Sequence, residues 1–211
     1  MPLKITQISN YTKGEFKKLI KDINISTEPL KTYLNTMAYK HTTDGCFITY
    51  LLENIQETNK IIGYISFSNT VIESDCQEAK ELLNVSSSMK YPIPTLKITR
   101  LAICDEFQGK NFGKILIAFA EIKAFIQQES TGCKAIVVDS KNSAINFYEK
   151  TNFISIENYS DDYNTTFMIK KIPTVKELKS SRFLEETIAN YIAICEICNL
   201  DTEKDIFSKI S

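Results

Sequence analysis

The sequence predicts an α/β (α+β) protein in which a mixed, mostly antiparallel twisted sheet is flanked by helices. Segments 46–52 and 61–67 are apolar and are joined by the polar turn 57–60, which is typical of a hairpin. After residue 92, three apolar segments alternate with helical patterns in the order β-α-β-α-β. Hydrophobic residues form 43% and charged residues 24% of the 211 residues, so the chain has enough apolar material for a core.

Two helices are expected before this sheet, over residues 14–24 and 27–41. The second has an apolar face made by Leu30, Tyr33, Leu34 and Met37. His41, at the end of this polar helical pattern, is interpreted as a surface or capping residue. Pro92 and Pro94 indicate an extended approach to the next strand.

The second half of the chain contains the β-α-β-α-β series. A strand over 96–104 leads into a helix from Gly113, and further strands are expected over 134–138 and 165–172. A short helix over 143–151 separates them. The long helix buries residues that recur at the helical period, namely Ile115, Phe119, Ile122 and Ile126.

The connection between the strand 96–104 and the following helix is a candidate phosphate site. Backbone N–H groups at a helix start lack intrahelical partners, and the helix dipole adds positive charge there. Gly109 and Gly113 permit close approach of a ligand, while Lys110 and Lys114 add charge. The alternative is an ordinary strand-to-helix connection.

A second motif follows the strand 134–138. Residues 139–153, read together with 100–114, resemble the GNAT superfamily of acetyl-CoA-dependent N-acetyltransferases over about residues 4–172. In that family Gln/Arg-x-x-Gly-x-Gly/Ala wraps the pyrophosphate of coenzyme A. Here Gln108 and Gly113 match, whereas Asn111 replaces the middle glycine. Asn is the non-glycine residue that best tolerates the left-handed conformation.

The second motif resembles the family pattern Asn-x-x-Ala-x-x-Phe-Tyr-x-x-x-x-Phe, with two departures. The small residue stands at Ala144, and Asn152 replaces the glycine that commonly precedes Phe153. Asn152 also suits a left-handed helix cap. Asn142 is either a cofactor contact, as the resemblance implies, or only the N-cap of the helix that carries Tyr148.

The resemblance implies the fold, acetyl-CoA as cofactor, and a set of site residues. Tyr148 is the family's usual acid, and its alternative is a core tyrosine with a satisfied hydroxyl. Sequence does not decide the general base among Glu73, Asp105, Glu106 and ordered water. The implied cofactor-binding residues are Leu101, Ala102 and Ile103 along the pantetheine arm, Gln108, Gly109, Lys110, Asn111, Phe112, Gly113 and Lys114 around the pyrophosphate, and Asn142.

Within the superfamily, Tyr33-Leu34 and segment 62–68 resemble the acetyltransferase toxins of bacterial toxin-antitoxin pairs. This implies aminoacyl-tRNA as acceptor and an antitoxin as partner. A tRNA-binding surface is normally basic, but the net charge is −1 and the arginines are Arg100 and Arg182. A local patch on the first helix, Lys13, Lys17, Lys18 and Lys21, is the candidate RNA contact, and a solvated helix face is its alternative.

Residues 1–173 are expected to form the GNAT domain, and residues 174–211 a C-terminal helical extension. Its apolar face must pack on its own domain, on a second copy in a homodimer, or on a partner such as an antitoxin. Cys195 and Cys198 form a Cys-x-x-Cys pair without further ligands nearby, so packing is favoured over a metal or redox site and no metal is expected. That face is made by Leu184, Ile188, Tyr191, Ile192 and Cys195.

The predicted function is acetyl transfer to a primary amine. The alternatives are a small-molecule or protein N-acetyltransferase, a non-catalytic acyl-CoA-binding module, and an interaction protein built around the C-terminal helix. Six scattered cysteines indicate reduced thiols. A cytoplasmic protein without membrane contact is expected, because neither a signal peptide nor a long apolar segment is found in the sequence.

Overall fold

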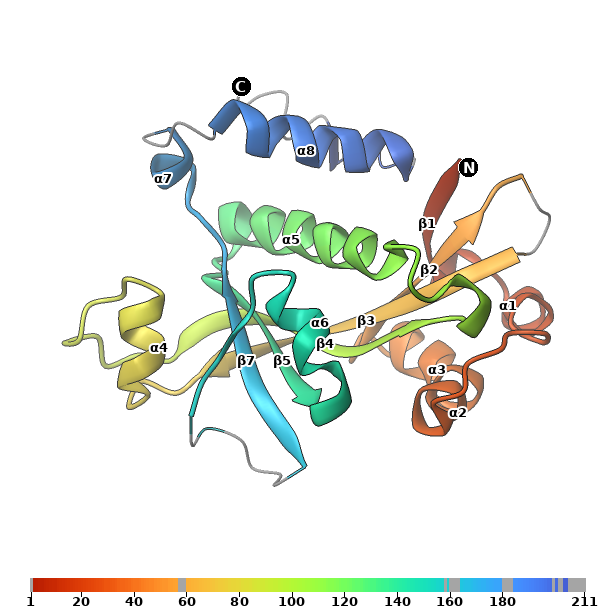
Figure 1. Ribbon diagram of the computed structural model, residues 1–211, viewed down its shortest axis with the longest axis horizontal. Helices are drawn as coiled ribbons and strands as arrows, with labels where there is room; N and C mark the ends of the chain where they lie inside the picture. Colours follow the sequence, from red (N-terminus) through yellow and green to blue (C-terminus); the bar gives the residue numbers. More distant parts are fainter. Residues whose placement is uncertain are drawn as a thin grey trace. The chain divides into compact units, whose positions relative to one another are not determined.

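A seven-stranded sheet forms the centre of the computed structural model, which describes residues 2–56, 60–157, 159, 164–179, 184–198, 200 and 203–204. Hydrogen-bonded neighbours follow the order β1-β2-β3-β4-β5-β7-β6 (Figure 1). The β4–β5 pair is parallel, while β1–β2, β2–β3, β5–β7 and β6–β7 are antiparallel. The predicted mixed, mostly antiparallel sheet is therefore confirmed. Its strands are β1 Leu3–Gln7, β2 Ile48–Asn54, β3 Lys60–Ile72, β4 Ile93–Ile103, β5 Ala135–Lys141, β6 Ile154–Ser155 and β7 Thr165–Lys171.

The helices agree with the predicted series in the second half of the chain and differ from it in the first. The long helix and the short helix near Tyr148 are both found. Helix α4 was not expected from the sequence, whereas α7 and α8 lie within the expected helical extension 174–211. The helices are α1 Lys13–Leu19, α2 Glu28–Thr36, α3 Ala38–Thr43, α4 Gln77–Leu82, α5 Phe112–Ser130, α6 Ile145–Glu149, α7 Val175–Lys179 and α8 Leu184–Ile197, with 3-10 turns η1 Ile8–Asn10, η2 Asp105–Phe107 and η3 Asn142–Ala144.

The N-terminal part of the prediction is wrong in two respects. The sheet does not follow two helices, because β1 precedes them. Apolar and polar residue types alternate along β1, with Leu3 and Ile5 buried and Lys4 exposed. Five residues of such alternation are a short signal. The expected helix over 27–41 is two helices, since the chain bends at Met37, where φ is −116°. The hairpin turn at 57–60 falls largely outside the described residues.

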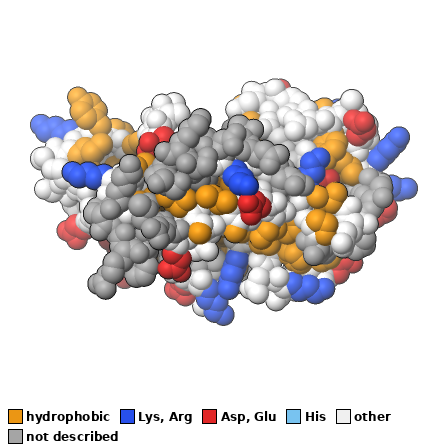
Figure 2. All heavy atoms as spheres, turned by 90° about the horizontal axis from the view of Figure 1, so that it is seen from above, with side chains coloured by type: hydrophobic (Ala, Val, Ile, Leu, Met, Phe, Trp, Pro, Cys, Tyr) orange, Lys and Arg blue, Asp and Glu red, His pale blue; other side chains and the backbone are white. Residues whose placement is uncertain are grey.

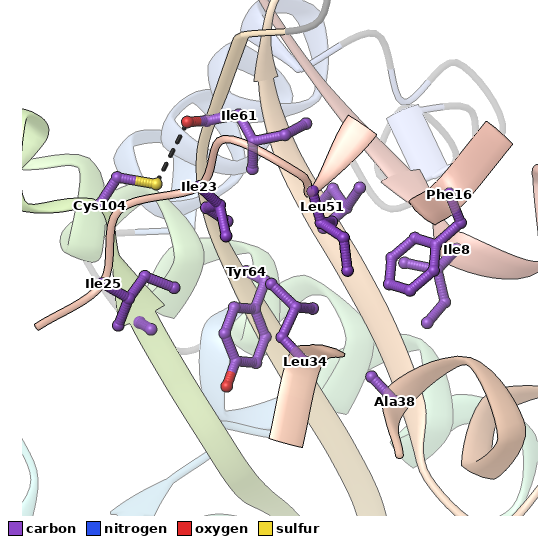
Figure 3. Packing of buried hydrophobic residues seen from close by; sticks show 12 residues of the cluster. Ile8, Phe16, Ile23, Ile25, Leu34, Ala38, Leu51, Ile61, Tyr64 and Cys104 are labelled. Carbon is purple, nitrogen blue, oxygen red and sulfur yellow. Dashed lines mark hydrogen bonds between the residues drawn. The ribbon is translucent and has the colours of Figure 1, made fainter. Parts of the chain in front are cut away.

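The chain divides into two compact units, and the first comprises Met1–Ser68, Thr99–Phe119 and Phe183–Ser211. In it, α1, α2 and α3 pack on one face of β2 and β3. Figure 3 shows this cluster, in which Phe16, Leu34 and Ala38 from the helices meet Leu51 and Tyr64 from the strands. All five side chains are fully buried. Burial of this size is the main favourable term that fixes these helices to the sheet.

The other face of the same strands is covered by the start of α5. Tyr50 is the neighbour of Leu51 in β2, and successive strand residues point to opposite faces. The Tyr50 and Phe119 ring centroids lie 4.9 Å apart, and Phe67 of β3 lies 6.0 Å from Phe119. The first unit therefore has helices on both faces of its strands, as predicted.

The C-terminal helix α8 belongs to this first unit. Ile188, Tyr191, Cys195 and Cys198 are buried within the chain itself, so the apolar face of the tail packs on its own fold. The Ile5 N–H of β1 donates to the Cys198 carbonyl over 3.3 Å. The end of α8 thus covers part of a sheet edge, which protects its backbone groups from pairing with another chain.

The second unit comprises Asn69–Ile98 and Ala120–Arg182. β5 pairs with β7 along its whole length. Ala135 lies opposite Lys171 at one end of the pair, and Lys141 lies opposite Thr165 at the other. Ile136, Val137, Met168 and Ile169 are fully buried along this pair, and the apolar runs fit strands covered on both faces. No helix among the described residues is long and apolar enough to cross a membrane.

Candidate functional site

The turn between β4 and α5 lies in the first unit and has an exposed backbone. After the 3-10 turn η2, residues 108–111 are all exposed, and α5 begins at Phe112. Gly109 and Asn111 are left-handed, with φ of 74° and 65°. The Lys114 N–H donates to the Asn111 carbonyl over 3.0 Å. The start of a helix of 19 residues favours anions through its dipole and its terminal amides, and pyrophosphate binding at this turn stays a prediction.

Asn111 allows the turn to keep its left-handed backbone without the middle glycine of the family motif. Left-handed backbone costs an ordinary L-residue about 1–2 kcal/mol, but Asn reaches it readily. The φ of 65° confirms that Asn111 takes the conformation expected of it.

The Gln108 side chain braces the turn against the end of β4. Its Nε2 donates to the Ile103 carbonyl over 3.2 Å and to Asp105 Oδ1 over 3.1 Å. The Asp105 carboxylate also accepts from the N–H and the hydroxyl of Ser26. Ser26 could not be found from the sequence, because a contact across 79 residues leaves no local pattern.

Asp105 and Glu106, two candidate general bases, are engaged in other contacts. The hydrogen bonds from Ser26 lower the pKa of Asp105, which makes it a weaker base. Glu106 forms an ion pair with Lys60 at 2.7 Å. Lys60 and Lys110 lie over the Phe107 ring, at 5.5 and 5.6 Å from its centroid. The two carboxylates therefore hold the turn in place.

Two hydrogen bonds fix the orientation of Ile103 at the end of β4. The Cys104 N–H donates to the Ile62 carbonyl of β3 over 2.8 Å. The Ile103 carbonyl belongs to the same planar trans peptide, so it points away from β3, toward Gln108. The N–H and carbonyl of one strand residue face the same side, so the Ile103 N–H also points away from β3.

Tyr148 lies in the second unit, near the end of α6. The Asn152 N–H donates to Glu149 and the Phe153 N–H to Tyr148, at 2.9 and 3.1 Å, and Asn152 has φ 65°. This is a Schellman cap, as expected for Asn152. Tyr148 is 6% exposed, and burial raises its pKa, so its phenol stays protonated. No hydrogen bond from its hydroxyl is found within the described part of the chain.

Asn142 is not the helix N-cap that the sequence allowed. It is the exposed first residue of η3, for which Lys141 is the N-cap, while Ala144 is the N-cap of α6. The intervening 3-10 turn displaces Asn142 from the helix start. Its cofactor contact stays a prediction.

His41, which was interpreted as a surface or capping residue, is half-buried in the last turn of α3 and packs against aromatic rings. Its ring lies 5.0 Å from Phe47 and 5.8 Å from Tyr33. The chain reverses there, since the Cys46 and Phe47 N–H groups both donate to the His41 carbonyl. Its Nδ1 is buried and has no hydrogen-bond partner among the described residues.

The six cysteines are free thiols. Burial raises the pKa of Cys195 to about 11 and that of Cys198 to about 12, so neither is a reactive thiolate. Within the described ranges, no group of three or more His, Cys, Asp or Glu residues could hold a metal. Packing accounts for the Cys-x-x-Cys pair.

Comparison with known proteins assigns the fold. Residues 45–155, more than half of the chain, match the model of the acetyltransferase (GNAT) domain. Similar solved structures include a bacterial toxin, with TM-score 0.69 and 16% identity over 82% of this chain and 92% of that chain. A tyrosine-to-phenylalanine mutant of KacT gives 0.65 and 19% over 82% and 96%. AtaT complexed with acetyl-methionyl-tRNAfMet gives 0.64 and 20% over 78% and 93%.

These matches agree with the exposed turn at the start of α5 and with the mixed sheet. Acetyl-CoA supplies an activated thioester for transfer to an amine. The chain therefore belongs to the GNAT acetyltransferase family and is an acetyl-CoA-dependent N-acetyltransferase.

Proposed function

We propose that the acceptor is the amino group of an aminoacyl-tRNA, and that the protein acts as the toxin of a toxin-antitoxin pair. The toxin-like segments Tyr33-Leu34 and 62–68 support this acceptor. So does the similarity in fold to AtaT, which has been solved with acetyl-methionyl-tRNAfMet. An acetylated amino group cannot form a peptide bond from its nitrogen, so translation would be affected.

The exposed left-handed turn, Gly109 to Asn111, is the observation that carries the cofactor site. We assign pyrophosphate binding to the turn, with the charges of Lys110 and Lys114 and the space left by Gly113. Gln108 supports the turn through its hydrogen bond to the Ile103 carbonyl. Phe112 supports it through an edge-on contact with Phe107, whose ring centroid lies 5.8 Å away. Leu101, Ala102 and Ile103 offer a strand edge to the pantetheine arm, with Asn142 as a further contact.

Tyr148 is the proposed acid. Its burial keeps the phenol protonated, so its O–H can donate to the departing thiolate. Tyrosine-to-phenylalanine mutants of both KacT and AtaT are among the similar solved structures. The base is proposed to be Glu73 or ordered water, because Asp105 and Glu106 are engaged in the turn.

The proposed RNA contact is a small lysine surface beside α1. Lys13, Lys17 and Lys18 lie on α1 and are exposed, and Lys21 follows the end of the helix at Leu19. Lys17 Nζ donates to the Asn35 carbonyl, so Lys18 and Lys21 are better RNA ligands. Figure 2 shows basic and acidic side chains interspersed on the face it draws. The described side chains on that face form no broad basic surface for RNA.

The test is transfer of labelled acetyl to charged tRNA, combined with arrest of cell-free translation. Neutralising Lys18 and Lys21 to Gln should weaken tRNA binding and lower the slope of log K against log salt by about one unit per lost phosphate contact. Lys90→Gln with Lys150→Gln is the matched control, since both residues are exposed in the second unit. Absence of acetyl-tRNA and of translation arrest would contradict the proposal.

The net charge of −1 favours the second candidate, a small-molecule or protein N-acetyltransferase. Labelled acetyl recovered in metabolite or protein fractions, rather than in RNA, would identify it. A non-catalytic acyl-CoA-binding module and an interaction protein built on α8 have less support, because the chain belongs to an enzyme family and the apolar face of α8 is buried.

An antitoxin partner is proposed by analogy with AtaT, which has been solved bound to the C-terminus of the antitoxin AtaR. A GNAT domain over 1–173 with an extension over 174–211 stays our proposed division. Since the described apolar face of α8 is buried in its own unit, a homodimer or an antitoxin would use another surface. Light scattering of the purified chain, alone and with a co-expressed antitoxin, distinguishes these assemblies.

A further inference from the structure

Gly63 of β3 and the end of β4 approach each other more closely than a side chain would allow. A Cβ built on Gly63 would lie 2.4 Å from the Ala102 carbonyl oxygen and 3.1 Å from the Ile103 Cα. It would also lie 2.8 Å from the Ile103 Cδ1, at the end of a side chain. Contacts of 3.4–4 Å are ordinary, so the backbone of β4 occupies space that any other residue at 63 would need.

A β-bulge next to Gly63 accompanies this approach. Leu52 of β2 pairs with Gly63, but Glu53 pairs with Ile61, so Ile62 is an extra residue on β3. The Ile62 carbonyl accepts the Cys104 N–H over 2.8 Å. Figure 3 shows the second link, from the Cys104 Sγ to the Ile61 carbonyl at 3.2 Å. The bulge therefore fixes β4 just after Ile103.

The close contact determines where one backbone donor points. The Ala102 carbonyl lies on the Gly63 side of β4, and in a trans peptide the attached Ile103 N–H points the opposite way. The Ile103 carbonyl, which points the same way as this N–H, is already held by Gln108. The Ile103 N–H is thus aimed along the strand edge assigned to the pantetheine arm.

We propose that Gly63 is a positioning residue that places the Ile103 N–H as the hydrogen-bond donor to the carbonyl of the acetyl thioester. The inference rests on the assignment of Leu101–Ile103 to the pantetheine arm under Proposed function. A Cβ at 63 forces the Ala102 carbonyl to move by about 1 Å to restore ordinary contact, and the Ile103 N–H moves with it. Useful oxyanion donors lie at about 2.7–3.1 Å, so this donor would be lost.

The first test is Gly63→Ala, measured by isotope-edited infrared spectroscopy of acetyl-CoA labelled with ¹³C at the thioester carbonyl. Bound to the wild type, this carbonyl should absorb at lower frequency than in water, and in Gly63→Ala it should return toward the free value. Hydrolysis of acetyl-CoA to acetate and the CoA thiol should slow by about a hundredfold, while acetyl-CoA affinity changes less than about threefold. Gly14→Ala is the control, since a Cβ there meets nothing within 4 Å.

A double variant separates the backbone contact from the side-chain contact. Ile103→Val removes the Cδ1 atom and leaves the Ala102 carbonyl in place. If the clash with the Ala102 oxygen displaces the Ile103 N–H, the double variant Gly63→Ala with Ile103→Val should not recover the wild-type infrared shift of the thioester carbonyl. Full recovery would overturn the proposal. So would an unchanged carbonyl frequency in a folded Gly63→Ala.

A measurement on the wild type keeps the proposal open to refutation if Gly63→Ala does not fold. The Ile103 amide proton should shift downfield in NMR spectra when acetyl-CoA binds, and less when CoA binds without its acetyl group. An Ile103 amide that responds equally to both ligands contradicts the role. None of these measurements needs an acceptor, so failure to acetylate tRNA would not affect them.

Discussion

The Phe153 N–H donates to the Tyr148 carbonyl over 3.1 Å, and the two aromatic rings lie edge to face with centroids 5.2 Å apart. Tyr148 is therefore held both through its backbone and through its ring. Phe147, the preceding residue, also lies edge-on to the Tyr148 ring, with centroids 5.1 Å apart. Restraint of this kind fixes the direction of the hydroxyl before any substrate binds, which is what a positioned acid requires.

Removing only the Tyr148 hydroxyl should lower turnover without loss of cofactor binding. One hydrogen bond to a charged leaving group is worth about 1.5–3 kcal/mol, so Tyr148→Phe should slow the chemical step about ten- to a hundredfold. Single-turnover kinetics and calorimetry with acetyl-CoA measure the two effects. Tyr91→Phe is the control, because Tyr91 is 77% exposed. Unchanged single-turnover rates in Tyr148→Phe would exclude the residue as the acid.

The pH dependence of turnover should show no contribution from Tyr148 in the neutral range. Burial raises the Tyr148 pKa above its ordinary value of 10, and the active form of an acid is the protonated one. The phenol is fully protonated below pH 10, so activity should not decline through this group as the pH rises from 7 to about 9. A falling limb in that interval that Tyr148→Phe abolishes would contradict this assignment.

Position 111 should tolerate substitution by glycine but not by a β-branched residue. Gly adopts the observed φ of 65° without strain, so Asn111→Gly should keep or tighten acetyl-CoA binding. Asn111→Val should lose about 1–2 kcal/mol of stability and bind acetyl-CoA more weakly, because valine disfavours left-handed backbone. Thermal melts and calorimetry compare the three proteins. Wild-type affinity in a fully folded Asn111→Val would show that the left-handed turn is not needed for binding.

Glu177 should stabilise the start of α7 above acid pH. Its carboxylate accepts from Lys171 at 2.6 Å and from the Thr174 N–H at 2.8 Å, and these contacts lower its pKa from 4.5 to about 2. A lowered pKa adds stability above pH 4.5 that is lost as the pH falls toward 2. Because 37% of the side chain is exposed, we expect solvent screening to limit the loss in Glu177→Gln to about 1 kcal/mol at pH 7.

Urea unfolding as a function of pH checks the Glu177 prediction. The stability difference between wild type and Glu177→Gln should be constant above about pH 5 and should shrink toward pH 2. Glu129→Gln, at an exposed position near the end of α5, is the control and should have little effect. A difference that grows toward low pH would contradict the assignment.

The helix α8 should contribute to the stability of the first unit. Ile188 is 4% exposed, so Ile188→Ala should lower the free energy of unfolding by about 2 kcal/mol or more. Ala193→Gln, on the exposed side of the same helix, should change it by less than about 0.5 kcal/mol. Chemical denaturation of the purified chain measures both. Equal, small effects would mean that α8 is not packed on its own unit in solution.

The sequence by itself determined those parts of the protein that depend on local pattern. Apolar runs located most of the strands, the helical period of Phe119 and Ile122 located α5, and the spacing of Gln108, Asn111 and Gly113 located the turn to which we assign pyrophosphate binding. The left-handed caps at Asn111 and Asn152 could also be predicted, because few residue types tolerate that conformation. β1 was missed because five alternating residues are too short a signal.

Only the tertiary structure decided the contacts between segments that are distant in sequence. Ser26 meets Asp105, Gly63 meets Ala102, and the end of α8 meets Ile5 of β1. None of these pairs has a local pattern, since each depends on how the strands and helices of one unit pack. The same packing places the half-buried His41 ring beside Phe47. Local spacing indicated which residues could bind a cofactor, and packing decided how the backbone at Gly63, Ala102 and Ile103 is oriented.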